Sequence, residues 1–198
     1  FVSPNDPHWR IHRMMKMLYN EKDFFFIHVD SLLQYHGEDD AGDDAHGRDS
    51  LVKASAHAVD DVQELLGEYM TRGNLKIEAI FDVSWGGVSM LNAEIAMAQA
   101  LIQMGDWDYI INLSSSDLPL QTREKLIQRL LQDYGKSFVW GVPQSEESIN
   151  KRGLAYMFVE CEGHSYRIAN HYSMPDGIQL TGGSSWYLLH RSFVKFIV

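Results

Sequence analysis

The sequence has little cysteine and no concentrated positive charge. A single cysteine, Cys161, stands among 198 residues, so no disulfide can form within the chain and cysteine usage identifies no compartment. Lys and Arg number 17 against 27 Asp and Glu, which gives a formal net charge of -10, and no basic block occurs. Because an acidic surface repels phosphates, DNA and RNA are excluded as partners.

Long apolar runs and several catalytic signatures are also missing. No run reaches the length of a membrane span, and no signal peptide is present. There is no Walker-type glycine–lysine loop, no dinucleotide fingerprint and no glycine–serine–glycine nucleophile elbow. The nine histidines do not pair with cysteine at zinc-ligand spacing. Since the chain begins at Phe1 and ends at Val198 in mid-pattern, we expect one domain over residues 1–198, truncated at both ends.

What is present is an alternation of helical and extended apolar segments. Asp6-Pro7, Ser89 and Thr122 suit helix starts, and Gly105 suits a helix end. Such alternation predicts an α/β fold with a mostly parallel sheet and helices on both faces. The expected helices cover residues 7–18, 52–69, 89–104 and 122–134, and the expected strands cover 23–29, 75–83, 109–113, 137–140, 178–180 and 186–190.

The segment 107–119 carries the clearest chemical signal. Its apolar part, Tyr109 to Leu113, reads as a buried strand that ends abruptly in Ser114, Ser115, Ser116 and Asp117. Ligands bind at the carboxyl ends of the strands in open α/β sheets, and hydroxyls with a carboxylate suit a polyhydroxylated ligand. The alternative is a serine-rich turn in which Asp117 bonds its own backbone.

Two other expected strands end in polar or permissive residues. His28 and Asp30 follow the strand 23–29, and Trp85-Gly86-Gly87 follow the strand 75–83. Asp30 can accept hydrogen bonds from a ribose or a base, Trp85 offers a flat face for stacking, and the glycines allow close approach to backbone. The alternatives are that Trp85 fills the core and that the glycines mark a turn.

Two acidic clusters raise the question of a metal. Residues 37–49 hold Asp39, Asp40, Asp43 and Asp44 among glycines and alanines, but their spacing does not fit an EF-hand, so a solvated loop is expected there. Asp106-Trp107-Asp108 has the Asp-x-Asp form with which many glycosyltransferases hold a divalent cation. It precedes its strand, away from the expected ligand edge, and no carboxylate stands two residues from Asp117. We therefore predict no metal.

Taken together, four segments resemble one family, the inverting glycosyltransferases of family 14, the core 2/branching enzymes, which include peptide O-xylosyltransferases and core 2 N-acetylglucosaminyltransferases. Phe158-Val159-Glu160-Cys161 with His164 and Arg167 is similar to the xylosyltransferase branch in particular. The four segments are Phe-Phe-Ile-His-Val-Asp (25–30), Trp-Gly-Gly-Val-Ser (85–89), the stretch 107–122 and Gly-Gly-Ser-Ser-Trp (182–186) with the residues that follow to 194.

The resemblance implies a GT-A-like (Rossmann-like) fold and a metal-independent enzyme that transfers a sugar from a UDP-sugar, with inversion, to a protein or glycan acceptor. The leading specificity is xylose from UDP-xylose to protein serine, as in proteoglycan biosynthesis. It also implies a lumenal Golgi location through a membrane anchor outside this stretch. The alternatives are a core 2 type N-acetylglucosaminyltransferase, a catalytically inactive relative that binds sugar nucleotides, and an unrelated α/β binding module.

The resemblance also implies roles for individual residues. Asp30 would contact the nucleoside, and Gly182 to Trp186 would stand beside the reacting centre. Xylosyltransferases have an acid, the expected general base, where this sequence has Ser185, and a basic residue where it has Leu32. The catalytic base is therefore left unassigned. The candidate substrate-binding residues are His28, Asp30, Trp85, Gly86, Gly87, Ser114, Ser115, Ser116, Asp117, Gly182, Gly183, Ser184, Ser185 and Trp186.

Overall fold

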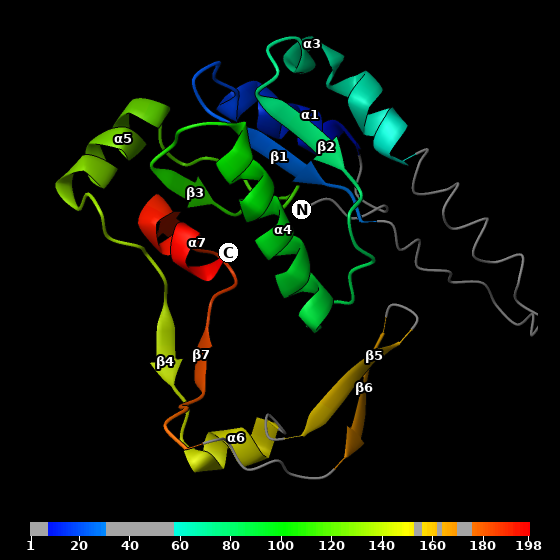
Figure 1. Cartoon of the computed structure of the whole chain (residues 1–198), viewed down its shortest axis with the longest axis vertical. Coiled ribbons are helices and arrows are strands. Elements are labelled where there is room, and N and C mark those ends of the chain that lie inside the picture. The colour runs from blue at the N-terminus through cyan, green and yellow to red at the C-terminus, as the bar shows by residue number, and fades with distance from the viewer. Residues whose placement is uncertain (1–7, 31–57, 153–155, 162–163, 170–175) are drawn as a thin grey trace, which may run out of the picture.

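The structure, a computed structural model, describes residues 8–30, 58–152, 156–161, 164–169 and 176–198 (Figure 1). It has an α/β fold in which helices accompany small two-stranded sheets. The described helices are α1 (His8–Leu18), a helical stretch over 58–65 continued by α3 (Gly67–Met70), α4 (Val88–Met104), α5 (Arg123–Gln132), α6 (Glu146–Arg152) and α7 (Arg191–Ile197). The strands are β1 (Phe25–His28), β2 (Leu75–Glu78), β3 (Tyr109–Ile111), β4 (Gly141–Pro143), β5 (Met157–Cys161), β6 (His164–Ala169), β7 (Thr181–Gly183) and β8 (Leu188–His190).

The strand pairing differs from the mostly parallel sheet predicted from the sequence. Among the described strands, β1 and β2 are parallel, whereas β3–β8, β4–β7 and β5–β6 are antiparallel. The helix–strand alternation predicted the parallel pair correctly. The antiparallel partners β7 and β8 come from the irregular last part of the chain, where a local pattern does not indicate which earlier strand they join.

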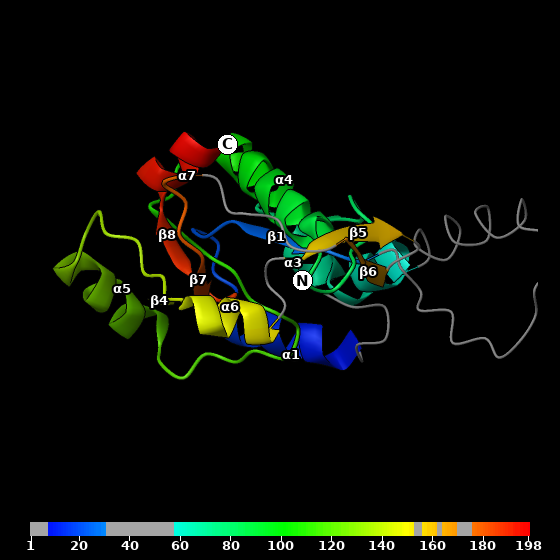
Figure 2. The same ribbon diagram turned by 90° about the horizontal axis from the view of Figure 1, so that it is seen from below.

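The main core lies around the parallel pair. Figure 2 shows α4 on one side of β1 and α1 on the other, so helices cover both faces of this part of the sheet. The side chains of Ile11, Met15 and Leu66 are at most 1% exposed, and they pack with those of Ile27 and other strand residues. This core follows from the sequence, because an apolar helix face and a short apolar strand are both stable only when they are buried against other apolar side chains. A smaller core cluster joins Ala98, Leu189 and Val194.

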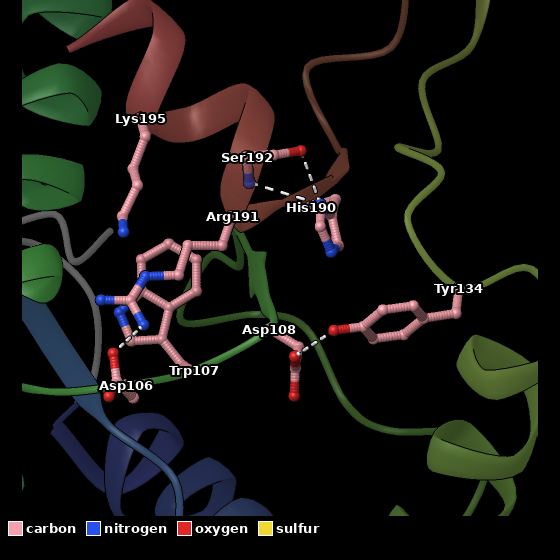
Figure 3. Close-up of a pocket in the computed structure, with 8 residues that line it drawn as sticks. All are labelled: Asp106, Trp107, Asp108, Tyr134, His190, Arg191, Ser192 and Lys195. Atoms are coloured by element: carbon pink, nitrogen blue, oxygen red, sulfur yellow. Dashed lines mark hydrogen bonds and ion pairs between the residues drawn. The ribbon is translucent and has the colours of Figure 1, made fainter.

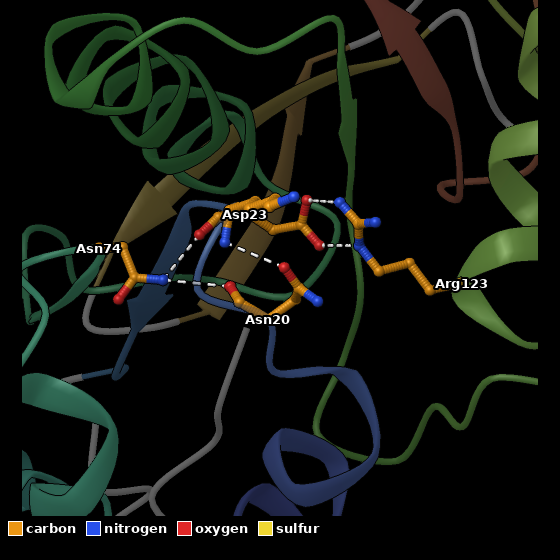
Figure 4. A network of polar contacts seen from close by, with 5 residues as sticks. Asn20, Asp23, Asn74 and Arg123 are labelled. Carbon is orange, nitrogen blue, oxygen red and sulfur yellow. Dashed lines mark hydrogen bonds and ion pairs between the residues drawn. The ribbon is translucent and has the colours of Figure 1, made fainter.

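A buried asparagine, Asn74, connects the start of β2 to the turn that precedes β1 (Figure 4). The amide of Asn74, 5% exposed, donates to the backbone oxygens of Asn20 (3.2 Å) and Asp23 (2.8 Å). Arg123, at the start of α5, binds both carboxylate oxygens of Asp23 at 2.5 and 2.6 Å. Because such a two-pronged pair is directional, it fixes α5 against the turn that precedes β1.

Most helix signals in the sequence are confirmed, with one shift. Gly105 terminates α4, and the Thr122 hydroxyl caps α5 by accepting from the Lys125 N–H at 3.4 Å. The predicted Ser89 cap is wrong, because α4 begins at Val88 with Gly87 as its N-cap. Ser89 instead lies in the first turn, where its hydroxyl accepts from the Ser84 N–H at 2.9 Å.

Some expected strands are displaced by a few residues. The predicted strand 137–140 is replaced by a single bridge between Phe138 and Leu188, followed by β4, and the predicted strand 178–180 is replaced by β7. The helix start at Asp6-Pro7, the acidic loop 37–49 and Leu32 lie outside the described residues. Within the described ranges, no helix is both long and apolar enough to cross a membrane.

Candidate functional site

At the end of β1, His28 and Asp30 turn inward and hold the chain that follows β2. The His28 side chain is fully buried, and its Nε2 accepts from the backbone N–H of Ile80 (3.3 Å) and Phe81 (3.1 Å). Burial lowers the pKa of His28 to about 4, so the ring is neutral and can accept these bonds. Asp30, 9% exposed, accepts from the Val83 N–H at 3.1 Å. Both side chains thus brace residues 80–83.

The following segment carries the exposed tryptophan and the two glycines. The Trp85 side chain is 89% exposed, so the alternative that it fills the core is wrong. Gly86 has φ +75°, a backbone conformation that favours glycine, and the Gly87 N–H closes a turn by donating to the Ser84 carbonyl at 2.9 Å. The glycine turn is therefore confirmed, and it presents an aromatic face to solvent.

Glu160, on β5, connects this strand to the start of α4, next to the glycine turn. Its carboxylate accepts from the Ser89 N–H at 3.0 Å, which satisfies a backbone group in the first turn of α4. The pKa of Glu160 is lowered, mainly by the Ser89 hydroxyl and to a smaller extent by the backbone N–H groups of Ser89 and Val88. A Cβ at Gly87 would meet this carboxylate, so any other residue there would displace the end of the Glu160 side chain. The sequence identified Glu160 only as part of a resembling segment, because nothing local links it to residue 89.

The serine turn after β3 is closed by its own aspartate. The Asp117 Oδ2 accepts from the Ser114 N–H (2.6 Å) and hydroxyl (2.9 Å), and it also accepts from the Trp186 indole N–H at 2.8 Å. Burial opposes ionisation of Asp117, but these hydrogen bonds outweigh it and leave the pKa of Asp117 lowered. Ser115 is 2% exposed, whereas Ser116 is exposed and accepts from Arg10 at 3.4 Å. The predicted turn with Asp117 bonding its own backbone is confirmed, and it also reaches Trp186.

The glycine–serine segment packs against β4. A Cβ at Gly182 would meet the Gln144 amide nitrogen at 2.5 Å, and one at Gly183 would collide with the Trp140 carbonyl. Ser184 continues the contact by donating its N–H to the Trp140 carbonyl at 3.3 Å, while its hydroxyl accepts from the Trp186 N–H at 3.1 Å. Ser185 and Trp186 are exposed. Bare backbone at Gly183 thus permits the close approach of β7 to β4, whereas a side chain at Gly182 would only displace the Gln144 side chain.

The predicted site residues therefore gather in two groups. The first holds Asp30, the Trp85 turn, α4 and Glu160, and the second holds the serine turn with Trp186 and its neighbours. Figure 1 shows the corresponding β5–β6 and β4–β7 pairs below α4, on different sides of it. Asn112, which the sequence placed only inside a resembling segment, belongs to the second group: its amide donates to the Ser185 carbonyl at 2.6 Å and accepts from the Tyr187 N–H at 2.7 Å.

The Asp-x-Asp sequence lies at the other end of β3, beside a hollow of about 460 Å³ (Figure 3). Asp106 pairs with Arg191, whose guanidinium lies 5.2 Å from the Trp107 ring centre, and Asp108 accepts from the Tyr134 hydroxyl at 2.8 Å. Both aspartates thus serve to fix neighbouring side chains. Across the described ranges, no three His, Cys, Asp or Glu side chains form a cluster that could hold a metal ion. The expectation of a metal-independent enzyme remains a prediction.

Comparisons with known proteins identify the family. The model of the family described as "Branch: Core-2/I-Branching enzyme" matches residues 5–198. The chain is 32% identical over 191 residues to "Xylosyltransferase oxt" of Drosophila melanogaster, covering 95% of this chain and 19% of that protein. It is 32% identical over 193 residues to "Xylosyltransferase 2" of Canis lupus familiaris and 31% identical over 193 residues to that of Homo sapiens, covering 96% of this chain and 19% of each protein.

The chain thus spans about a fifth of the length of the curated relatives that it matches. The family model, in contrast, matches nearly all of this chain, from residue 5 to residue 198, and this range includes all four of the resembling segments. It also covers both groups of candidate site residues described above. The chain belongs to the Core-2/I-Branching enzyme family.

Proposed function

We propose that this protein is a glycosyltransferase that moves a sugar from a UDP-sugar to an acceptor hydroxyl with inversion, and that it transfers xylose from UDP-xylose to protein serine. The observation that carries the proposal is the family match over residues 5–198. The choice of xylose is supported by relatives from an insect and from mammals that are named xylosyltransferases.

The GT-A-like single domain is part of the same proposal. β1, which pairs in parallel with β2, lies between α1 and α4 (Figure 2), so helices cover both faces here as in the nucleotide-binding halves of doubly-wound folds. Residues that follow β1 and β2 then stand at the carboxyl ends of parallel strands, where ligands bind in open α/β sheets. Asp30 and the Trp85 turn occupy these positions. In this arrangement the donor is met by an exposed aromatic face and by glycine backbone.

Transfer with inversion needs a group that takes the acceptor proton during displacement. Asp117 is a poor candidate for this base. One of its oxygens already accepts three hydrogen bonds, which stabilise the ionised form, lower the pKa and so weaken the carboxylate as a proton acceptor. Ser185 is another poor candidate, because a serine hydroxyl is a weak base without an activating partner. We therefore assign the segments 114–117 and 182–186 to contacts with the donor and acceptor, and we leave the catalytic base unassigned.

The setting of the reaction follows from the same proposal. The donor is a UDP-sugar, the acceptor is a protein or a glycan, and no metal or other cofactor takes part. We expect the protein on the lumenal side of the Golgi membrane, held by an anchor that lies outside residues 1–198. Nucleic acid is not expected among its partners, given the net charge of -10.

A titration tests the proposal. The natural gene product that contains this chain is titrated with UDP-xylose, UDP-N-acetylglucosamine and UDP-glucuronate, and transfer to a serine-containing peptide is then followed with and without EDTA. We expect UDP-xylose to bind and to be consumed, with no change on adding EDTA. Binding of none of the three sugar nucleotides contradicts the glycosyltransferase proposal, whereas transfer of N-acetylglucosamine in place of xylose replaces the specificity by that of the core 2 type.

One observation favours a second candidate, a relative that binds sugar nucleotides without turnover. By the resemblance described above, xylosyltransferases have an acid at the position of Ser185, and the Ser185 carbonyl accepts from the Asn112 amide at 2.6 Å. The variant Ser185→Asp places a carboxylate on that fixed backbone. If the wild type binds UDP-xylose without transfer and the variant gains transfer, the inactive relative is the correct description. Turnover by the wild type contradicts it.

A further inference from the structure

The ladder between β3 and β8 ends in an unusual way. Its register pairs Tyr109 with His190 and Ile111 with Leu188, so the next facing residues are Asn112 and Tyr187. At this step the Tyr187 N–H donates to the side-chain oxygen of Asn112, at 2.7 Å. A side-chain amide therefore takes a position that a peptide group would occupy in a longer ladder. The backbone ladder ends at Ile111 and Leu188, and the Asn112 side chain makes the next connection between the two segments.

The other end of the same amide holds the peptide group before Trp186. Its nitrogen donates to the Ser185 carbonyl at 2.6 Å. The Ser185 carbonyl and the Tyr187 N–H belong to the two peptide groups on either side of Trp186. One asparagine thus fixes the backbone on both sides of this tryptophan.

The Trp186 ring is fixed as well. Its indole N–H donates to Asp117 at 2.8 Å, although 52% of the residue is exposed. Exposed side chains ordinarily keep rotamer freedom, and ordering one has an entropic cost. Here Asp117 accepts from the indole N–H, and the Asn112 amide holds the peptide groups on either side of Trp186, so a large aromatic ring is ordered at the surface. Such an arrangement is that of a preorganised binding face, because ligands lose less free energy on meeting a ring that is already ordered.

We propose that Asn112 and Asp117 are positioning residues that hold Trp186 as a fixed stacking face for a sugar ring and that set the place of Ser185 beside it. Neither residue exchanges a proton in the reaction. Asn112 acts through the backbone on both sides of Trp186, and Asp117 acts through its indole N–H. This inference rests on the proposed function, since it assigns these residues to the site where the sugar is transferred.

Two conservative variants remove one bond each. Asn112→Asp retains an acceptor for the Tyr187 N–H but loses the donor to the Ser185 carbonyl, and it places two oxygens against each other. Trp186→Phe retains an aromatic face and loses only the indole N–H that binds Asp117. A matched control, Tyr134→Phe, removes a hydrogen bond of the same kind to Asp108 at the opposite end of β3.

The kinetic readout separates positioning from a merely structural role. We expect both variants to bind UDP-xylose within about twofold of the wild type, while kcat for transfer falls about 10-fold to 100-fold, because a misplacement of about 1 Å costs up to about 10²-fold in rate. Tyr134→Phe retains the wild-type kcat. A kcat per folded molecule that is unchanged in Trp186→Phe, a surface variant expected to fold, overturns the proposal.

A second readout does not depend on activity. Hydrogen exchange of the Trp186 indole N–H, followed by NMR, is expected to be slow in the wild type and at least 10-fold faster in Asn112→Asp. If the wild type neither binds UDP-sugars nor transfers xylose, the proposed function fails. The exchange rate then still tests whether Asn112 holds Trp186 in place. Equal exchange in the wild type and in Asn112→Asp overturns the positioning role of Asn112.

Discussion

The parallel β1–β2 region and the antiparallel β3–β8 end are built on different principles. Around β1 and β2, buried apolar side chains such as Leu66 and Ile27 make the contacts, and His28 and Asn74 satisfy backbone groups inside the core. At the end of β3, exposed residues such as Trp186 and Ser185 are held by a few hydrogen bonds to the side chains of Asn112 and Asp117. Burial supplies stability in the first region, whereas directional bonds supply geometry in the second. Variants in the two regions should therefore affect different properties.

The largest effect is expected from the core of the first region. Leu66→Ala removes buried methyl groups from a fully buried side chain, and the free energy of unfolding should fall by about 2–5 kcal/mol. Urea unfolding followed by circular dichroism measures the change. The control Leu131→Ala, on a 65% exposed side chain, should change stability by less than about 0.5 kcal/mol. Equal effects at the two positions would contradict the assignment of the core.

The next effect is the pH dependence due to His28. Its pKa is about 4 in the folded chain against 6.5 for an unperturbed histidine, so the unfolded state binds the proton more readily. Stability is unaffected above pH 6.5 and falls as the pH drops toward 4, by roughly 3 kcal/mol in all. In His28→Gln, which retains an acceptor without titrating, unfolding between pH 7 and pH 4.5 should lose most of this dependence. A slope identical to that of the wild type would show that His28 is not the group responsible.

A smaller and local effect is expected from Glu160. Glu160→Ala removes the acceptor for the Ser89 N–H, a change comparable to losing a helix cap, at about 0.5–2 kcal/mol. Amide exchange should accelerate in β5, β6 and the first turn of α4, while amides of β1 and β2 keep their protection. Uniform acceleration over the whole chain would instead place Glu160 in the main core.

The smallest effect concerns Glu94, whose carboxylate accepts from the Tyr187 hydroxyl at 3.0 Å in an apolar groove between α4 and α7. Burial raises the pKa of Glu94, so its ionised form destabilises the fold at neutral pH, and this cost disappears as the pH falls through the raised pKa. Glu94→Gln should therefore stabilise the protein at pH 7 by less than about 1 kcal/mol, and the gain should vanish in acid. If Glu94→Gln is instead less stable than the wild type at pH 7, the hydrogen bond from Tyr187 to the ionised Glu94 outweighs the cost of burying the charge.

Local patterns in the sequence predicted the first region better than the second. The apolar spacing of α1 and the apolar run of β1 indicate their own burial, and Thr122 and Gly105 mark helix ends by chemistry that needs no distant partner. The roles of Asn112 and Glu160 were missed for the opposite reason. Their partners lie more than 70 positions away along the chain, at residues 185 and 89.

The sequence by itself determined the alternation of helices and strands, the serine turn that Asp117 closes, and the family to which the chain belongs. These depend on periodicity, on hydrogen bonds within a few residues and on the order of motifs along the chain. Only the tertiary structure decided that β3 pairs with β8, that Glu160 binds the start of α4, and that Asn112 and Asp117 together fix Trp186. Hydrogen bonds between distant residues form only once the core has brought their segments together, and no local pattern encodes that approach.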